Sequence, residues 1–192
     1  MTDVLEFLKR RRSVSAAFLG PPAPSPAELD EILTVAARVP DHGKLTPWRF
    51  IVFAGEARRQ AGEALAARFG EREPEAEEAR LDEERNRLAQ APLVVVVVSR
   101  AAPHPKIPEW EQVLSSGNAA MNLVLAVHAL GYAAQWTTGW IAYDEEAGRI
   151  LGLAEGERVT AVVHIGTPTV LVTDRPRPKL ADVVTHWAPP SG

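Results

Sequence analysis

The feature that most constrains the fold is a long, mostly apolar stretch from Pro108 to Gly139. Pro108 suits the first position of a helix, acidic residues follow it, and Gly131 suits the left-handed position that ends a helix. The apolar residues cover more than one helical side: Val113, Leu114, Met121, Val124, Leu125 and Val127. We therefore predict a helix of about 20 residues, about 30 Å long, buried nearly all round in a core or at an interface.

A membrane span is not expected, because polar residues interrupt this stretch: Glu109, Glu111, Asn118, Asn122 and His128. The chain of 192 residues is expected to form a single domain over 1–192. Its 21 basic and 25 acidic residues imply no general attraction to nucleic acids or acidic membranes. The basic cluster near the N-terminus follows the apolar residues, the reverse of a secretory signal, so we expect a cytoplasmic protein.

The expected elements alternate irregularly, which indicates an α+β fold with a central mixed sheet of four to five strands flanked by helices. A first helix has a possible capping box at Asp3 and Glu6, and Ser25-Pro26-Ala27-Glu28 predicts the start of a second. Another is expected over 56–69, and Asp144 is a plausible N-cap for a short helix ending near Gly152. Strands are expected over 49–53, 93–98, 132–136 and 159–165.

Two segments are harder to place in this scheme. Residues 71–90 are highly charged and are expected to form one or more exposed helices with opposite charges at helical spacing. The proline-rich tail from Thr167 to Gly192 carries apolar residues at Leu180, Val183, Val184 and Trp187. We expect that tail to pack against something, and a neighbouring subunit is one candidate.

Common catalytic motifs are absent. The sequence has no GxGxxG, no GxxxxGK[ST] and no GxSxG, and zero cysteines exclude a thiol nucleophile. The five histidines form no ligand pair such as HExxH, so no metal site is expected. His128 and His164 are interpreted as core or interface histidines. An enzyme of this composition would need a cofactor to carry its chemistry, and we name no catalytic side chain.

Two polar segments each allow two readings. The run Lys9-Arg10-Arg11-Arg12-Ser13 is either a solvated helix end or an anion site in which arginines and a serine grip a phosphate. The loop 40–48 is either an ordinary turn at Asp41 and His42 or a ligand-contacting loop held between two rigid elements.

Four separated segments together resemble the nitroreductase family of FMN-dependent oxidoreductases, and in particular its short single-domain branch. They are Arg11-Arg12-Ser13-Val14-Ser15, Arg38-Val39-Pro40-Asp41-His42 leading to Pro47-Trp48, Gly131 followed by Trp136-Thr137-Thr138-Gly139, and Gly166-Thr167-Pro168 with Arg177-Pro178-Lys179-Leu180. The resemblance implies a nitroreductase-like fold and an interlocked homodimer with FMN at the subunit interface.

The resemblance also implies roles for particular residues. Arg11, Arg12 and Ser13 match the triplet that holds the FMN phosphate and ribityl chain. Trp136, Thr137 and Thr138 match the segment that lines the isoalloxazine, and Arg38 and His42 match positions that reach the flavin from the other subunit. Arg177 lies near a basic position that contacts the phosphate, and Ser15 stands where many members carry a cation near the ring. A nicotinamide nucleotide site is implied at Ala126, Val127, His128, Ala129, Leu130 and Gly131.

The function implied by this resemblance is hydride transfer from NAD(P)H through N5 of FMN to nitro compounds, quinones or similar acceptors, by a ping-pong mechanism. The protein would supply binding and orientation without a side-chain acid or base. Three alternatives stay open: other flavin chemistry such as dehalogenation, azoline oxidation or flavin fragmentation; a non-catalytic flavin-binding or interaction module; and a plain α+β domain with coincidental motifs.

Overall fold

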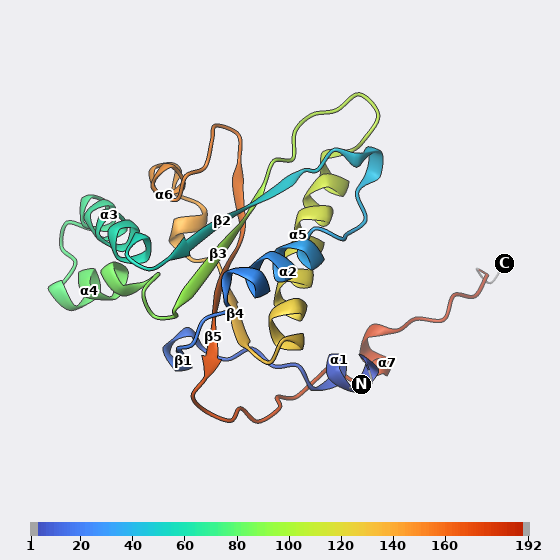
Figure 1. Cartoon of the computed structure of the whole chain (residues 1–192). Helices are drawn as coiled ribbons and strands as arrows, with labels where there is room; N and C mark the ends of the chain where they lie inside the picture. Colours follow the sequence, from blue (N-terminus) through green and yellow to red (C-terminus); the bar gives the residue numbers. More distant parts are fainter. Residues whose placement is uncertain (1–3, 190–192) are drawn as a thin grey trace.

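A computed structural model describes residues 4–189, which form one antiparallel sheet with helices on both faces (Figure 1). The strands are β1 (Leu19–Gly20), β2 (Trp48–Ala54), β3 (Leu93–Ser99), β4 (Ala133–Thr137) and β5 (Arg158–Pro168). The α-helices are α1 (Val4–Arg10), α2 (Pro26–Ala36), α3 (Ala57–Arg72), α4 (Glu78–Asn86), α5 (Glu109–Ala129), α6 (Glu145–Ile150) and α7 (Leu180–Val183). Short 3-10 helices lie at η1 (Ala16–Phe18), η2 (His42–Lys44) and η3 (Trp140–Ala142).

Strand β5 is the centre of the sheet. It pairs with β3, with β4 on its other edge and with β1 at its C-terminal end, and β2 lies beyond β3. The expected strand number is confirmed, but the expectation of a mixed sheet is wrong for the described residues, because all of their pairings are antiparallel. The connection between β2 and β3 shows one reason: α3 and α4 form a hairpin that returns the chain to the same end of the sheet, where Ala54 pairs with Leu93.

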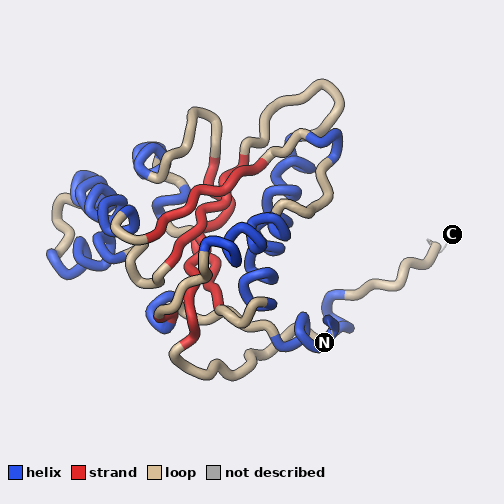
Figure 2. The backbone as a smooth tube through the Cα atoms, in the orientation of Figure 1, coloured by secondary structure: helices blue, strands red, loops and turns tan. Residues whose placement is uncertain are grey.

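The sheet separates two hydrophobic layers, and strand β3 contributes to both (Figure 2). Val95 and Val97 face α2 and α5, whereas Val94, Val96 and Val98 face α3, α6 and η3. All seven residues of β3 are buried, as predicted from its continuous β-branched run. Alternate side chains of an extended strand point to opposite faces, so a strand covered on both sides must be apolar throughout.

Two predicted helix caps are confirmed. Ser25 and Glu28 make both hydrogen bonds of a capping box at the start of α2. The Asp144 carboxylate accepts a hydrogen bond from the Ala147 amide at the start of α6. The cap expected at Asp3 lies outside the described residues. Pro108 is the N-cap of α5 rather than its first helical residue, and Gly131 has the expected positive φ, 89°.

Helix α5 has one buried face, and the prediction that it is buried nearly all round is wrong for the described chain. Ala120, Leu123 and Val127 pack against the sheet and α2. On another side the apolar side chains of Trp110, Val113, Leu114 and Met121 are exposed. The long tail after β5 is exposed too and runs away from the sheet, with Trp187 83% exposed (Figure 1). The apolar residues are therefore where the sequence pattern indicates, but this chain's own core leaves those on one side of α5 and in the tail exposed.

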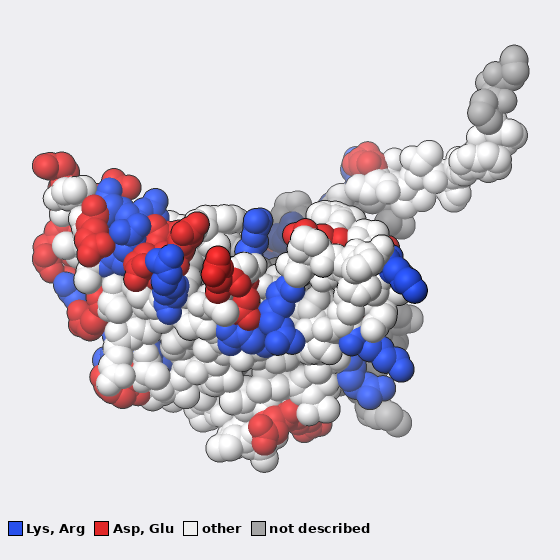
Figure 3. Space-filling view, turned by 90° about the horizontal axis from the view of Figure 1, so that it is seen from above, with Lys and Arg blue, Asp and Glu red and all other residues white. Residues whose placement is uncertain are grey.

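Basic and acidic side chains intermingle over the end of the molecule that α3 and α4 form (Figure 3). Residues 71–90 hold the end of α3 and the whole of α4, so the expected helix formation is confirmed. The prediction that this segment is exposed is wrong at two positions in its C-terminal part. Glu84 and Leu88 are both completely buried. No helix within residues 4–189 combines the length and the apolar character that crossing a membrane requires.

Candidate functional site

The segment after α1 lies directly against strand β4. The Val14 amide donates a hydrogen bond to the Ala134 carbonyl oxygen over 3.2 Å, and the Ala16 amide donates one to Oε1 of Gln135 over 2.6 Å. These bonds fix residues 11–16 beside the strand that continues into Trp136. The structure therefore brings together two of the four sequence segments singled out above.

Four guanidinium groups gather at this place: Arg11, Arg12, Arg175 and Arg177. Burial lowers the pKa of Arg11, and the positive charges of Arg177, Arg12 and Arg175 lower it further. We call the cavity beside them the arginine pocket. It has a volume of about 410 Å³, and Arg10, Arg11 and Arg12 line it together with parts of α1, the C-terminal end of α5 and the tail at 170–172.

The charges of the arginine pocket are only partly balanced. Asp174 forms ion pairs with Arg177 at 3.0 Å and with Arg12 at 3.5 Å. No ion pair or hydrogen bond to the Arg11 guanidinium is found within residues 4–189. The cluster therefore has an excess of positive charge that a bound anion would offset.

His128 lines the same pocket from the last turn of α5. Its Nε2 atom is buried and lacks a hydrogen-bond partner in the described part of the chain. Burial, followed by the charge of Arg11, lowers the pKa of His128 to about 4. The side chain is thus neutral at pH 7 and presents an unsatisfied nitrogen beside a cationic group. His164, the other histidine interpreted as a core residue, is buried in β5, which confirms that interpretation.

The donor set of the arginine pocket fits the phosphate of FMN. A phosphate dianion is bound best by planar, charged donors, and guanidinium groups offer several in a fixed geometry. The orphaned Nε2 of His128 adds a polar group that the fold leaves without a partner. No comparable fit exists for a metal ion, since no group of metal ligands occurs among residues 4–189.

Two further predicted residues, His42 and Arg38, lie along α5 at a distance from the arginine pocket. His42 contacts Glu111, with 2.7 Å between Nδ1 and Oε2, whereas His128 and Arg11 are near the helix C-terminus. Positions 111 and 128 are 17 residues apart on α5, which corresponds to about 25 Å. Arg38 lies between these ends, where its carbonyl oxygen accepts a hydrogen bond from Asn122, six residues and about 9 Å before His128. Within one chain, therefore, His42 cannot contact the same phosphate as Arg11.

Comparison with known proteins identifies the family. The model of the Nitroreductase family matches residues 8–167. This chain belongs to the nitroreductase family. It is 33% identical over 166 residues to the Escherichia coli (strain K12) protein named "Putative NAD(P)H nitroreductase YdjA", covering 86% of this chain and 88% of that protein. A Haemophilus influenzae protein with a similar name is 37% identical over the same shares of the two chains.

Solved structures show the same fold. A nitroreductase-like family protein from Bacillus cereus matches with a TM-score of 0.83 at 23% identity, covering 97% of both chains. A nitroreductase from Bacteroides fragilis, solved with bound FMN, matches with a TM-score of 0.72 at 23% identity, over 98% of this chain and 100% of that one. The expected nitroreductase-like fold is therefore confirmed.

The remaining site residues of this nitroreductase-family chain are placed as follows. Ser13 and Ser15 are exposed on the segment beside β4, and Trp136 is 39% exposed at the end of that strand. Thr137 and Thr138 are half-buried, and the Thr137 hydroxyl donates to the Val162 carbonyl oxygen. Of the six residues at 126–131, Ala126 and Val127 are buried in the core, and His128 lines the arginine pocket. Ala129, Leu130 and Gly131 are exposed.

Two residues of the site escaped the sequence reasoning. Arg175 belongs to the guanidinium cluster beside the arginine pocket, and its place in the RPRP run beside Arg177 was the available signal. Gln135 ties the N-terminal segment to β4, and nothing in the sequence indicated a partner 119 residues away.

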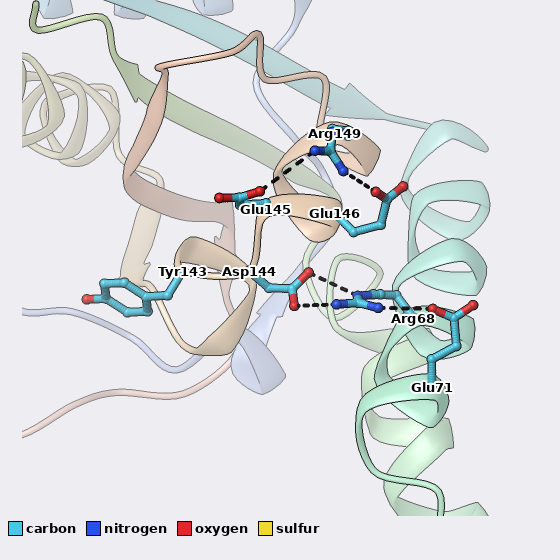
Figure 4. A pocket seen from close by; sticks show the side chains of 7 residues that line it. All are labelled: Arg68, Glu71, Tyr143, Asp144, Glu145, Glu146 and Arg149. Carbon is cyan, nitrogen blue, oxygen red and sulfur yellow. Dashed lines mark hydrogen bonds and ion pairs between the residues drawn. The ribbon is translucent and has the colours of Figure 1, made fainter.

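A second cavity of about 570 Å³ lies between α3 and α6, and its side chains are shown in Figure 4. Its two arginines are bound by carboxylates: Arg68 by Asp144 and Glu71, and Arg149 by Glu145 and Glu146. The dashed lines in Figure 4 show that these arginines already have acidic partners within the fold. This cavity therefore lacks the unbalanced positive charge that distinguishes the arginine pocket.

Proposed function

We propose that this chain is an FMN-dependent oxidoreductase that takes hydride from NAD(P)H and delivers it to a nitro compound, a quinone or a similar acceptor. The observation that carries the proposal is the arginine pocket. There the residues expected to hold the FMN phosphate meet in space with an excess of positive charge. Membership of the nitroreductase family and the NAD(P)H nitroreductase names of its relatives support the same activity.

Bound FMN would supply the redox chemistry, accepting hydride at N5 and releasing it to the acceptor in a ping-pong cycle. Arg11, Arg12 and Arg177 would bind the phosphate, and Ser13 and Ser15 lie on the segment that leads from it toward β4. The segment Trp136–Thr138 would orient the ring. The protein's contribution is therefore binding and geometry, which requires no acid or base at the reacting atom.

We further propose that the active form is an interlocked homodimer, with a single domain spanning 1–192 in each subunit. The exposed apolar side of α5 and the exposed tail support this, because a monomer would leave Trp110, Leu114 and Trp187 in water. The separation of His42 from Arg11 supports it as well. In this proposal Arg38 and His42 of one subunit reach the FMN that Arg11 of the other subunit holds.

A mixed dimer tests this arrangement. Arg11→Ala and His42→Ala homodimers are each expected to bind FMN weakly. If the two residues serve one site from different subunits, a heterodimer of the two variants carries one doubly altered site and one intact site. It should therefore recover one tightly bound FMN per dimer. Failure to recover any tight site would show that the two residues do not act across the interface.

The activity itself is tested by anaerobic titration of the purified protein with NADH and, separately, NADPH, while the flavin absorbance is followed. Bleaching by either nucleotide, followed by recovery on adding a nitroaromatic compound or a quinone, is the expected result. A flavin that neither nucleotide bleaches would favour other flavin chemistry, such as dehalogenation or azoline oxidation. A protein that binds FMN but turns over no acceptor would favour the non-catalytic module.

The place of NAD(P)H and the cellular location complete the proposal. We assign the nicotinamide nucleotide to the end of α5 at 126–131, where contact would be made by the exposed residues and His128 rather than by the buried Ala126 and Val127. We place the protein in the cytoplasm, the compartment in which its nucleotide substrates are available.

A further inference from the structure

The highly charged hairpin of α3 and α4 contains a fully buried carboxylate, Glu84. Its Oε1 accepts a hydrogen bond from Nη2 of Arg87 at 2.6 Å and forms an ion pair with Nη2 of Arg80 at 2.7 Å. Its Oε2 accepts hydrogen bonds from Nε of Arg87 at 2.5 Å and from Nε1 of Trp140 at 2.8 Å. Burying a carboxylate is unfavourable unless it is paired and hydrogen-bonded, so this arrangement is a built polar centre rather than a solvated face.

Glu84 remains ionised in this environment. Burial by itself would raise its pKa, but the hydrogen bonds from Arg87 and Trp140 and the charges of Arg87 and Arg80 outweigh that effect. The pKa of Glu84 therefore lies below its ordinary value. A charged acceptor forms a stronger hydrogen bond with the indole N–H of Trp140 than a neutral one would.

The ring of Trp140 also contacts the same hairpin. Its ring lies 5.4 Å from the Phe69 ring, and the Arg72 guanidinium lies 5.0 Å from its centroid. The hydrogen bond to Glu84 then fixes the direction of the indole N–H. Helices α3 and α4 thus set both the position and the orientation of this one side chain.

Trp140 comes directly after Thr137-Thr138-Gly139, the segment assigned to the flavin ring. The N-terminal end of this segment is fixed by the sheet, because Thr137 pairs with Val162 in strand β5. Its C-terminal end leaves the sheet through Gly139, which has a φ of 75°, and reaches Trp140. The Arg87 guanidinium also lies close to this end of the segment, because a Cβ atom added to Gly139 would be 3.4 Å from Nη1 of Arg87.

We propose that Glu84 is a positioning residue for the flavin, acting through its hydrogen bond to Trp140 to fix the backbone of residues 137–139 against the ring. This inference rests on the proposed function, since it takes residues 137–138 as the ring-lining segment. It gives the charged hairpin a role in the site: one end of the ring-lining segment is held by the sheet, and the other is held by α4.

The central test is Trp140→Phe, which removes the N–H donor and retains an aromatic ring between Phe69 and Arg72. The dissociation constant for FMN should rise about 5- to 10-fold, less than the full effect of one hydrogen bond to a charged group, because the lost bond acts on the flavin only through the backbone of 137–139. The visible circular dichroism of the bound flavin should change, because it reports the ring's surroundings. In the apoprotein, amide hydrogen exchange should accelerate in 137–140 but not in β3.

Two further variants separate positioning from general stability. Glu84→Gln keeps an acceptor for the Trp140 N–H but removes the charge that balances Arg87. It should lower the thermal unfolding midpoint and retain most of the parental flavin spectrum. Glu83→Gln is the matched control, because Glu83 is the neighbouring, exposed carboxylate that pairs with Arg80. It should change neither quantity.

The outcomes distinguish this inference from the proposed function. A parent protein that binds no FMN overturns both. A parent that binds FMN, together with a Trp140→Phe variant of unchanged affinity, flavin spectrum and local exchange, overturns the inference alone. If Trp140→Phe does not fold, the inference is judged on Glu84→Ala, which removes the acceptor that Glu84→Gln keeps: a lowered unfolding midpoint with an unchanged flavin spectrum means that Glu84 acts on stability only.

Discussion

The arginine pocket and the α3/α4 hairpin are both rich in arginine, but they differ in how far their arginines are paired with carboxylates. In the pocket, Arg11 is surrounded by Arg12, Arg175 and Arg177, and burial together with these like charges lowers its pKa. In the hairpin, hydrogen bonds from Arg68 to Asp144 and Glu71 raise the pKa of Arg68, and those from Arg85 to Glu63 and Glu78 raise that of Arg85. In the first group Arg12 and Arg177 share one carboxylate, Asp174, and Arg11 has none among the described residues, whereas Arg68 and Arg85 of the second group are each bound by more than one.

This difference shows what makes a run of charged residues a binding site. Folding could have supplied the pocket with carboxylates, as it does for the hairpin, where Asp144 has its pKa lowered to about 2 mainly by Arg68. Partly buried Arg11 beside three like charges carries an electrostatic cost that a bound anion would offset. Unbalanced charge, rather than the number of charges, therefore marks the site.

The largest expected effect contrasts one arginine from each region. Arg11→Gln should weaken FMN binding about 100-fold, which corresponds to about 2.7 kcal/mol, because it removes charged hydrogen bonds to the phosphate. It should not destabilise the apoprotein, since it relieves repulsion among the arginines. Equilibrium titration of the apoprotein with FMN and a thermal melt measure the two effects.

Arg85→Gln is the matched control, with the same change of side chain in the hairpin. It should leave FMN affinity unchanged and lower the thermal unfolding midpoint slightly, since Arg85 is bound by Glu63, Glu78 and Asp82. Equal effects of the two substitutions on FMN affinity would contradict the distinction between the regions.

A second prediction concerns how closely the hairpin is packed. A Cβ atom on Gly62 in α3 would lie 2.0 Å from the backbone oxygen of Arg85, so Gly62→Ala must push the two helices apart. We expect a loss of about 2 kcal/mol in unfolding free energy, measured by denaturant titration. In the same helix, a Cβ on Gly70 would meet Leu81 at an ordinary 3.6 Å. Gly70→Ala should therefore stabilise by about 0.5–1 kcal/mol, and a similar loss at both glycines would argue against close helix contact at Gly62.

Local sequence signals predicted much of the fold. The capping box at Ser25 and Glu28, the cap at Asp144 and the uninterrupted valines of β3 depend on neighbours in the sequence, so they could be read directly. The antiparallel pairing of the strands could not be read from local sequence, because it depends on the end of the sheet to which α3 and α4 return the chain. Burial of Glu84 was missed for a similar reason: its partner Trp140 is 56 residues away.

The candidate site was predictable to a different extent in its two parts. Arg11, Arg12 and Arg177 were found through resemblance to the nitroreductase family, and the fold brings them together. Arg38 and His42 were found in the same way, but the described chain places His42 at the far end of α5, and Arg38 contacts Asn122 between the two ends. If a second subunit completes the site, one chain alone shows only an exposed apolar surface where the two subunits would meet. The role of Arg38 and His42 is therefore a proposal.

The smallest expected effect compares two histidines, His128 in the arginine pocket and His164 in β5 near Arg87 of the hairpin's C-terminal end. Burial is the main cause that lowers the pKa of both His128 and His164 to about 4, with Arg11 adding to the effect at His128 and Arg87 at His164. Between about pH 6.5 and 4 the unfolded chain would bind protons that the folded chain does not. The unfolding free energy of the apoprotein should therefore fall as the pH falls through that window.

Binding of FMN should separate the two histidines. A phosphate in the arginine pocket offsets the charge that Arg11, Arg10 and Arg12 present around His128, and Glu6 is the acidic group that lines the same cavity. The bound phosphate should raise the pKa of His128 by about one pH unit, or about 1.4 kcal/mol. The pKa of His164 should not change, because His164 lies near Arg87 and does not line the pocket. NMR titration of the two imidazoles in the apoprotein and with FMN measures this directly. Equal movement of both values would mean that the phosphate acts through a global change of the fold, and no movement at His128 would place the phosphate elsewhere.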